Sequence, residues 1–220
     1  MIRALIFDMD GLMIDTEHLY WEVGRQIARE HGKMVSDDTL RRMMGRERLA
    51  SSRIFVAETG VPLSAEEVMH RREAMMLERF RAGIEPMPGL REILTQFHGR
   101  TKLGVATSSP RMLVEAALPA IGVAPFFDTI TAGDEITHGK PDPEIYLTTM
   151  RKLGAAPDES VVLEDAPAGA LAGKRAGAHV IAVPSELTER EDFSGASDER
   201  VKNLFEAADV VERLRQPGKA

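Results

Sequence analysis

The sequence predicts an α/β fold: a doubly wound (Rossmann-like) parallel sheet with an inserted small α-helical domain. Three observations support this prediction. Apolar runs of strand length alternate with helical patterns from about Pro88 to Val183. One more apolar run of strand length, residues 4–7, lies near the start of the chain. Residues 16–83 contain helical patterns only. We therefore expect a core domain from residues 1–15 and 84–220, and a helical domain from residues 16–83.

The core elements follow one another in a regular order. Leu90, Ile93, Leu94 and Phe97 have the spacing of one helix face. A second helical stripe ends at Gly122, and Pro119 within it should kink the helix or end it early. The tail from residue 185 is polar and less regular, with a short edge element expected near residues 208–211. The other expected core elements are strands at residues 102–106, 129–132, 161–164 and 179–183, and helices at residues 142–154 and 166–176.

The inserted segment predicts four short helices. The first ends near Gly32, Ser36 can cap the second, and the third spans residues 47–58. The fourth opens with a capping-box pattern at Ser64. Because this small bundle is inserted directly after the first strand and joined to the core at two points, we expect it to act as a lid over the strand ends.

Composition limits the classes of function. Hydrophobic residues make up 43% of the 220 residues, enough for a globular core, and 29% are charged. The net charge of -7 argues against binding nucleic acid or an anionic membrane. The absence of cysteine excludes disulfides and thiolate metal sites. No apolar run reaches transmembrane length and no signal peptide is evident, so we expect a cytoplasmic protein. We also expect a monomer or a weak dimer.

Two aspartates directly follow the first strand. Asp8 and Asp10 come after the apolar run of residues 4–7, and Gly11 then lets the chain turn. Open α/β sheets build their sites at the carboxyl ends of parallel strands. Two clustered carboxylates repel each other unless a cation or a proton compensates them. A divalent metal beside a carboxylate nucleophile is therefore the first hypothesis for this site.

Three more polar motifs fall after later strands. They are Thr107-Ser108-Ser109, Lys140-Pro141-Asp142-Pro143 and Glu164-Asp165. Each motif taken alone also fits a turn or a helix cap. Together with Asp8 and Asp10 they supply two aspartates, a hydroxyl, a cation and an acidic pair at one edge of the sheet, which suits phosphoryl transfer.

The residue types suggest a division of roles. Asp8 can attack phosphorus and form an aspartyl-phosphate, and Asp10 can protonate the leaving oxygen and later deprotonate water. Magnesium prefers oxygen ligands, which Asp8, the main-chain carbonyl of Asp10 and Asp165 can supply. Lys140 would offset the charge of the phosphate, and Thr107 with neighbouring groups such as Ser108 would bind phosphoryl oxygens.

The motifs resemble those of the haloacid dehalogenase superfamily of phosphotransferases. The four motifs stand in the order of that superfamily, and Gly139-Lys140-Pro141-Asp142-Pro143 and Leu163-Glu164-Asp165-Ala166-Pro167 are worded as in its β-phosphoglucomutase-like branch. The resemblance covers nearly the whole chain. It implies that Asp8 is the nucleophile, Asp10 the acid and base, and Asp165 a magnesium ligand. It also implies that Glu164 is a ligand or a support, and that the inserted helices are a cap domain.

That branch contains phosphatases and mutases. The wording around Asp15-Thr16-Glu17 is similar to phosphatases that act on small sugar, polyol or nucleoside monophosphates. We therefore expect a magnesium-dependent phosphatase, with a sugar-phosphate mutase as the alternative. A non-enzymatic phosphoaspartate receiver or a binding protein is a further alternative, against which the presence of both Asp8 and Asp10 argues. Substrate specificity is expected from residues of the inserted domain: Glu17, His18, Gly45 and Arg46.

Overall fold

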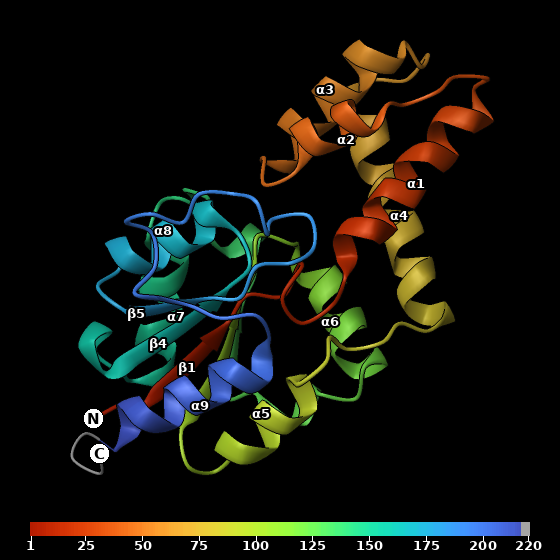
Figure 1. The fold of residues 1–220 in the computed structure, drawn as a ribbon. Coiled ribbons are helices and arrows are strands. Elements are labelled where there is room, and N and C mark those ends of the chain that lie inside the picture. Colours follow the sequence, from red (N-terminus) through yellow and green to blue (C-terminus); the bar gives the residue numbers. More distant parts are fainter. Residues whose placement is uncertain (217–220) are drawn as a thin grey trace. The chain divides into compact units, whose positions relative to one another are not determined.

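The computed structural model describes residues 1–216 and divides into two compact units (Figure 1). The first unit combines Met1–Asp15 with the chain from Glu85 onward, and the second is Thr16–Ile84. The segment that enters the second unit follows the first strand directly.

The first unit is built on one parallel sheet. Its four longest strands are fully or largely buried and mainly apolar, which is typical of a sheet covered on both faces. The strand order is β3-β2-β1-β4-β5-β6, and every pairing is parallel. The strands are β1 (Ala4–Phe7), β2 (Lys102–Ala106), β3 (Thr129–Thr131), β4 (Ser160–Glu164), β5 (His179–Ala182) and β6 (Glu199–Arg200).

The chain reverses its direction of winding between β1 and β4. It runs outward from β1 to β2 and β3, then returns to place β4 on the other side of β1. In register, Phe7 of β1 lies between Val105 of β2 and Leu163 of β4. Open α/β sheets carry their ligand sites at the carboxyl ends of the strands, at such a reversal point. The residues after β1 and β4 therefore lie where a site is expected.

Helices flank the sheet (Figure 1). Helix α7 (Glu144–Leu153) packs against β1, β2 and β3, and helix α8 (Pro167–Arg175) packs against β4 and β5. Helix α5 (Leu90–Phe97) packs against α9 (Leu204–Arg215). Apolar side chains of these elements form the core, for example Tyr146 and Met150 of α7 with Val162 of β4. The helices of this unit are α5 (Leu90–Phe97), α6 (Arg111–Ala120), α7 (Glu144–Leu153), α8 (Pro167–Arg175) and α9 (Leu204–Arg215), with short 3-10 turns at Ala124–Phe126, Gly133–Glu135 and Pro157–Glu159.

The second unit is entirely helical. Its helices are α1 (Thr16–Glu30), α2 (Asp37–Met43), α3 (Arg48–Thr59) and α4 (Ala65–Ala82), with contacts between α1 and α4, α2 and α3, and α3 and α4. Ser36 caps α2, and Ser64 with Glu67 forms the capping box of α4, as expected from the sequence. Within residues 1–216, no helix has the length and apolar character needed to cross a membrane.

One local prediction is wrong. The edge element expected near residues 208–211 is part of helix α9, because Asn203 caps that helix and Leu204, Ala207, Ala208 and Val211 bury one face at helical spacing. The sixth strand is instead the two-residue β6. Pro119 was expected to kink its helix or end it early, and helix α6 ends at Ala120, one residue after Pro119. Pro119 lies in the last turn, where its missing N–H costs only one hydrogen bond near the helix end.

Candidate active site

Asp8 lies at the carboxyl end of β1 and is 5% exposed. Its backbone N–H donates to the carbonyl of Leu163 at 3.0 Å, which extends the pairing of β1 with β4 by one residue. The chain then turns at Gly11, whose φ of 83° is in the left-handed region. The strand end and the turn together fix the Asp8 carboxyl at the reversal point of the sheet.

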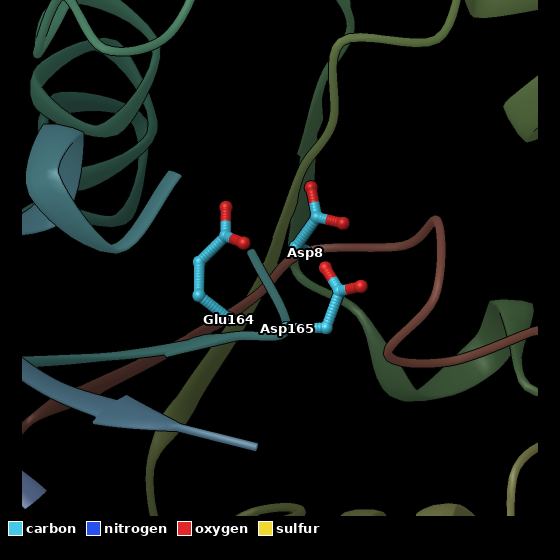
Figure 2. Close-up of side chains that lie close together, drawn as sticks. All are labelled: Asp8, Glu164 and Asp165. Atoms are coloured by element: carbon cyan, nitrogen blue, oxygen red, sulfur yellow. The ribbon is translucent and has the colours of Figure 1, made fainter. Parts of the chain in front are cut away.

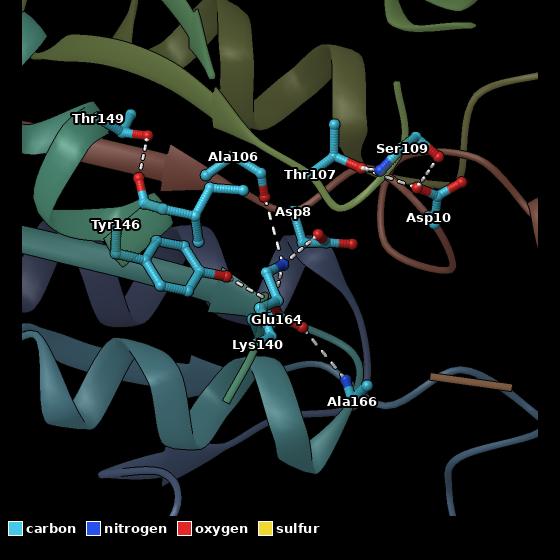
Figure 3. A network of polar contacts seen from close by, with 11 residues as sticks. Asp8, Asp10, Ala106, Thr107, Ser109, Lys140, Tyr146, Thr149, Glu164 and Ala166 are labelled. Carbon is cyan, nitrogen blue, oxygen red and sulfur yellow. Dashed lines mark hydrogen bonds and ion pairs between the residues drawn. The ribbon is translucent and has the colours of Figure 1, made fainter. Parts of the chain in front are cut away.

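Lys140 links Asp8 to Glu164 (Figure 3). Its Nζ donates to Oδ1 of Asp8 at 2.5 Å, to Oε1 of Glu164 at 2.5 Å, and to the carbonyl of Ala106 at 3.3 Å. The Lys140 side chain is 10% exposed. A buried ammonium with three oxygen partners at its three donors is fully satisfied. Lys140 therefore holds the ends of β1, β2 and β4 together by charge and hydrogen bonding.

Glu164 is held on both of its oxygens. Oε1 accepts from Lys140 and from the hydroxyl of Tyr146 at 2.5 Å, and Oε2 accepts from the backbone N–H of Ala166 at 3.4 Å. The Glu164 residue is 1% exposed. Tyr146 comes from α7, and its ring lies 5.1 Å from the Lys140 ammonium. Because its oxygens are already occupied, Glu164 is suited to hold Lys140 in place.

Burial and charge shift the pKa values of this group. Burial raises the pKa of Asp8 well above its ordinary value; Lys140 opposes this shift, and the neighbouring Glu164 and Asp10 add to it. Burial lowers the pKa of Lys140, but Asp8 and Glu164 outweigh that effect and leave its pKa well above the ordinary value. Burial, with Glu164 adding to it, raises the pKa of Tyr146. Lys140 therefore stays charged, and Tyr146 stays protonated as a donor to Glu164.

Three buried carboxylates lie close together beside the end of β4 (Figure 2). Asp8, Glu164 and Asp165 each place one carboxylate oxygen within 4.8 Å of the others. Asp165 is 3% exposed, and its backbone carbonyl accepts a hydrogen bond from Thr188 at 2.6 Å. Lys140 supplies one positive charge against three carboxylates. This all-oxygen set with an excess of negative charge fits a hard divalent cation such as magnesium.

Asp10 points its carboxylate toward the loop after β2 (Figure 3). Oδ2 of Asp10 accepts hydrogen bonds from the hydroxyls of Thr107 and Ser109, each at 2.8 Å. Among the described residues, the other oxygen, Oδ1, is buried without a hydrogen-bond partner. The Asp10 carboxylate is not part of the three-carboxylate group, so its main-chain carbonyl remains the atom expected to face a metal.

The structure thus brings six of the predicted site residues to one edge of the sheet: Asp8, Asp10, Thr107, Lys140, Glu164 and Asp165. Ser108, predicted to bind phosphate, lies in the same loop and is exposed. Sequence reasoning gave no role to Ser109 or to Tyr146. Ser109 stands in a motif that also fits a helix cap, and Tyr146 lies on the apolar face of α7. Neither carries a sequence signal that separates it from a structural residue.

Four further predicted residues belong to the second unit. Glu17 and His18 are in the first turn of α1, and the His18 ring lies 6.5 Å from that of Trp21. Gly45 has a φ of 65° between α2 and α3. Arg46 is exposed, and its Nε donates to the carbonyl of Arg42 at 2.7 Å. Their role in substrate specificity stays a prediction.

The chain is similar to known proteins along most of its length. A family model described as haloacid dehalogenase-like hydrolase matches residues 5–183. The phosphorylated carbohydrates phosphatase of Thermotoga maritima is 36% identical over 177 residues, which cover 80% of this chain and 82% of that protein. Validoxylamine A 7'-phosphate phosphatase of Streptomyces hygroscopicus subsp. limoneus is 33% identical over 207 residues, 94% of this chain and 96% of that protein. The crystal structure of CbbY from Rhodobacter sphaeroides in complex with phosphate is 26% identical, with a TM-score of 0.84 over 93% of this chain and 95% of that one.

Proposed function

Since this chain belongs to the haloacid dehalogenase-like hydrolase family, we propose that it is a phosphatase that hydrolyses small phosphate monoesters through an aspartyl-phosphate on Asp8. The observation that carries the proposal is the placement of the buried Asp8 carboxyl against the Lys140 ammonium at the end of β1. Two relatives are named as phosphatases, one of them for phosphorylated carbohydrates. We therefore propose a sugar or polyol monophosphate as the substrate class.

In the first half of the proposed reaction, a carboxylate oxygen of Asp8 attacks phosphorus. The bond between phosphorus and the alcohol oxygen breaks, and Asp10 gives its proton to that oxygen. Lys140 offsets negative charge beside Asp8, and the hydroxyl of Thr107 donates to a phosphoryl oxygen. Glu164 keeps the Lys140 ammonium next to Asp8 through the 2.5 Å contact. The products are a free alcohol and a phosphorylated Asp8.

In the second half, water attacks the phosphorus of the aspartyl-phosphate while Asp10 accepts a proton from that water. The bond between phosphorus and the Asp8 oxygen breaks, which releases inorganic phosphate and restores the Asp8 carboxylate. The unpartnered Oδ1 of Asp10 is the oxygen available for this proton, since Oδ2 already accepts two hydrogen bonds.

Magnesium is the proposed cofactor. Asp8, Asp165 and the main-chain carbonyl of Asp10 would hold it, and when bound it would offset the negative charge of the phosphoryl oxygens. Glu164 is the less suitable ligand of the buried group, because both of its oxygens already accept hydrogen bonds. We assign it a supporting role.

A substrate screen tests the proposed function. Steady release of inorganic phosphate from glucose 6-phosphate, glycerol 3-phosphate, sorbitol 6-phosphate or adenosine monophosphate, in the presence of Mg²⁺, is the expected result. In a parallel assay, β-glucose 1-phosphate is the substrate, glucose 1,6-bisphosphate primes the enzyme, and isomerisation of the sugar phosphate is followed. Isomerisation without phosphate release would instead identify a mutase, and a phosphoaspartate that persists without turnover would identify a receiver.

Gly11→Ala is expected to raise the Mg²⁺ concentration for half-maximal activity by about 10-fold or more. A Cβ at position 11 would lie 2.1 Å from Oδ2 of Asp165, so either the turn or the Asp165 carboxylate must move. The measurement is a Mg²⁺ titration of phosphatase activity after EDTA treatment, which should itself abolish activity until Mg²⁺ is added.

Gly154→Ala is the matched control for Gly11→Ala. Gly154 also has a positive φ, 66°, but a Cβ there would meet nothing within 4 Å. Both variants place a Cβ on a residue with a positive φ, and only Gly11→Ala disturbs Asp165. Identical Mg²⁺ titrations of the two variants, or activity indifferent to EDTA, would contradict the assigned metal site.

A further inference from the structure

Two hydroxyl groups share one oxygen of Asp10. Thr107 and Ser109 each donate to Oδ2 at 2.8 Å, and the backbone N–H of Ser109 donates to Oγ1 of Thr107 at 3.0 Å. The hydroxyl of Thr107 therefore accepts one hydrogen bond and gives its only proton to Asp10. The hydroxyl of Ser109 has Asp10 as its hydrogen-bond partner within the described part of the chain. The side chains form a closed arrangement around one carboxylate oxygen (Figure 3).

The loop that carries these hydroxyls is fixed by its backbone. The N–H of Thr107 donates to the carbonyl of Thr131 at 3.1 Å, and the carbonyl of Ser109 accepts from the N–H of Gly133 at 2.9 Å. The approach is so close that a Cβ on Gly133 would lie 2.1 Å from the carbonyl oxygen of Ser108. Ser109 is 7% exposed. Because Thr131 of β3 and Gly133 just beyond that strand anchor the loop at its two ends, the two hydroxyls are held at a fixed spacing from Asp10.

The hydroxyls of Thr107 and Ser109 have different roles in the proposed reaction. A hydroxyl has one proton, so Thr107 cannot donate fully to Asp10 and to a phosphoryl oxygen at the same time. When Thr107 turns its O–H toward the phosphoryl group, the hydrogen bond to Asp10 breaks and no proton changes its covalent partner. Ser109 then remains as the donor that restrains Oδ2 and leaves Oδ1 directed to the alcohol or to water.

We propose that Ser109 is a positioning residue that holds Asp10 for proton transfer while the Thr107 hydroxyl serves the phosphoryl group. This inference rests on the proposed function, because it gives Asp10 the acid and base role. It assigns a task to a side chain that the motif pattern alone does not single out. Loss of the Ser109 hydroxyl should therefore slow proton transfer to the leaving group and leave substrate binding unchanged.

Ser109→Ala tests the inference through the leaving group of the substrate. For a two-step phosphatase, kcat/KM contains only the steps up to departure of the alcohol. We expect Ser109→Ala to lower kcat/KM about 10-fold for the best sugar or polyol phosphate of the screen. For p-nitrophenyl phosphate we expect a change of no more than about 2-fold, because nitrophenolate leaves without protonation. Ser109→Thr keeps the hydroxyl and should recover most of the loss.

Ser160→Ala is the matched control. Ser160 is fully buried at the first residue of β4, and its Oγ donates to the carbonyl of Ala156 at 2.8 Å, so the variant loses a buried serine hydroxyl far along the strand from Glu164. It should leave both kcat/KM values unchanged. An equal loss for the two substrates in Ser109→Ala, or no loss for either, would overturn the inference. If the wild-type protein hydrolysed no phosphate monoester at all, the proposed function itself would be wrong.

Discussion

Asp8→Asn is expected to lower kcat for phosphate release by roughly 10⁴-fold or more, as the loss of a nucleophile does in other covalent mechanisms. The amide keeps the shape of the side chain but has no anionic oxygen to attack phosphorus. It is also a poorer ligand for a divalent cation. The measurement is steady-state phosphate release with the best substrate of the screen, at saturating Mg²⁺, beside a thermal unfolding curve that reports whether the variant is folded.

Asp128→Asn controls for the change from carboxylate to amide. Asp128 lies beside the opposite end of β2, where it accepts from the backbone N–H of Leu103 at 2.9 Å and pairs with Lys102 at 2.7 Å. It touches none of the site residues in these contacts, so Asp128→Asn should keep full activity. If Asp8→Asn retained a tenth of the wild-type rate, the nucleophile would have to be another group.

The central strands could be predicted from the sequence almost to the residue. Residues 4–7 and 102–106 were expected as strands and form β1 and β2. Both are short apolar runs with polar neighbours, and a buried parallel strand requires that pattern. The elements after residue 185 were harder to predict. Helix α9 needs its packing against α5 to bury its apolar face, and β6 has only two residues, too few for a periodic signal.

The residues of the site could be predicted from the sequence, but the hydrogen bonds and ion pairs between them could not. Parallel strands deliver their carboxyl ends to one edge of a sheet, so motifs after β1, β2 and β4 had to meet. The sequence does not say that the Lys140 ammonium lies between Asp8 and Glu164, because that depends on the path of a loop. The sequence also does not predict that the Ser109 hydroxyl donates to Oδ2 of Asp10. A serine that caps a turn and a serine that holds a carboxylate cannot be told apart by sequence alone.

Lys140→Met is expected to cost about 3–5 kcal/mol of stability at pH 8 and to lower kcat by at least about 100-fold. Methionine fills a similar volume, but the buried carboxylates of Asp8 and Glu164 lose the ammonium that lies 2.5 Å from each. A buried charge left without its partner is far more costly than a surface one. The free energy of unfolding is measured by urea titration in EDTA, so that bound metal does not contribute.

The destabilisation by Lys140→Met should shrink at acid pH. Burial already raises the pKa of Asp8, and Lys140 is the group that lowers it, so removal of Lys140 raises it further. A carboxyl whose pKa is higher in the folded state binds more protons folded than unfolded, so the folded variant gains relative stability as pH falls. The loss of unfolding free energy relative to wild type should therefore be smaller at pH 5 than at pH 8.

Lys102→Met is the control, because it removes a surface lysine that is 59% exposed and should cost at most about 1 kcal/mol of stability at either pH. If Lys140→Met lost no more unfolding free energy than Lys102→Met at both pH values, Lys140 could not be the buried counter-ion of the Asp8 carboxylate.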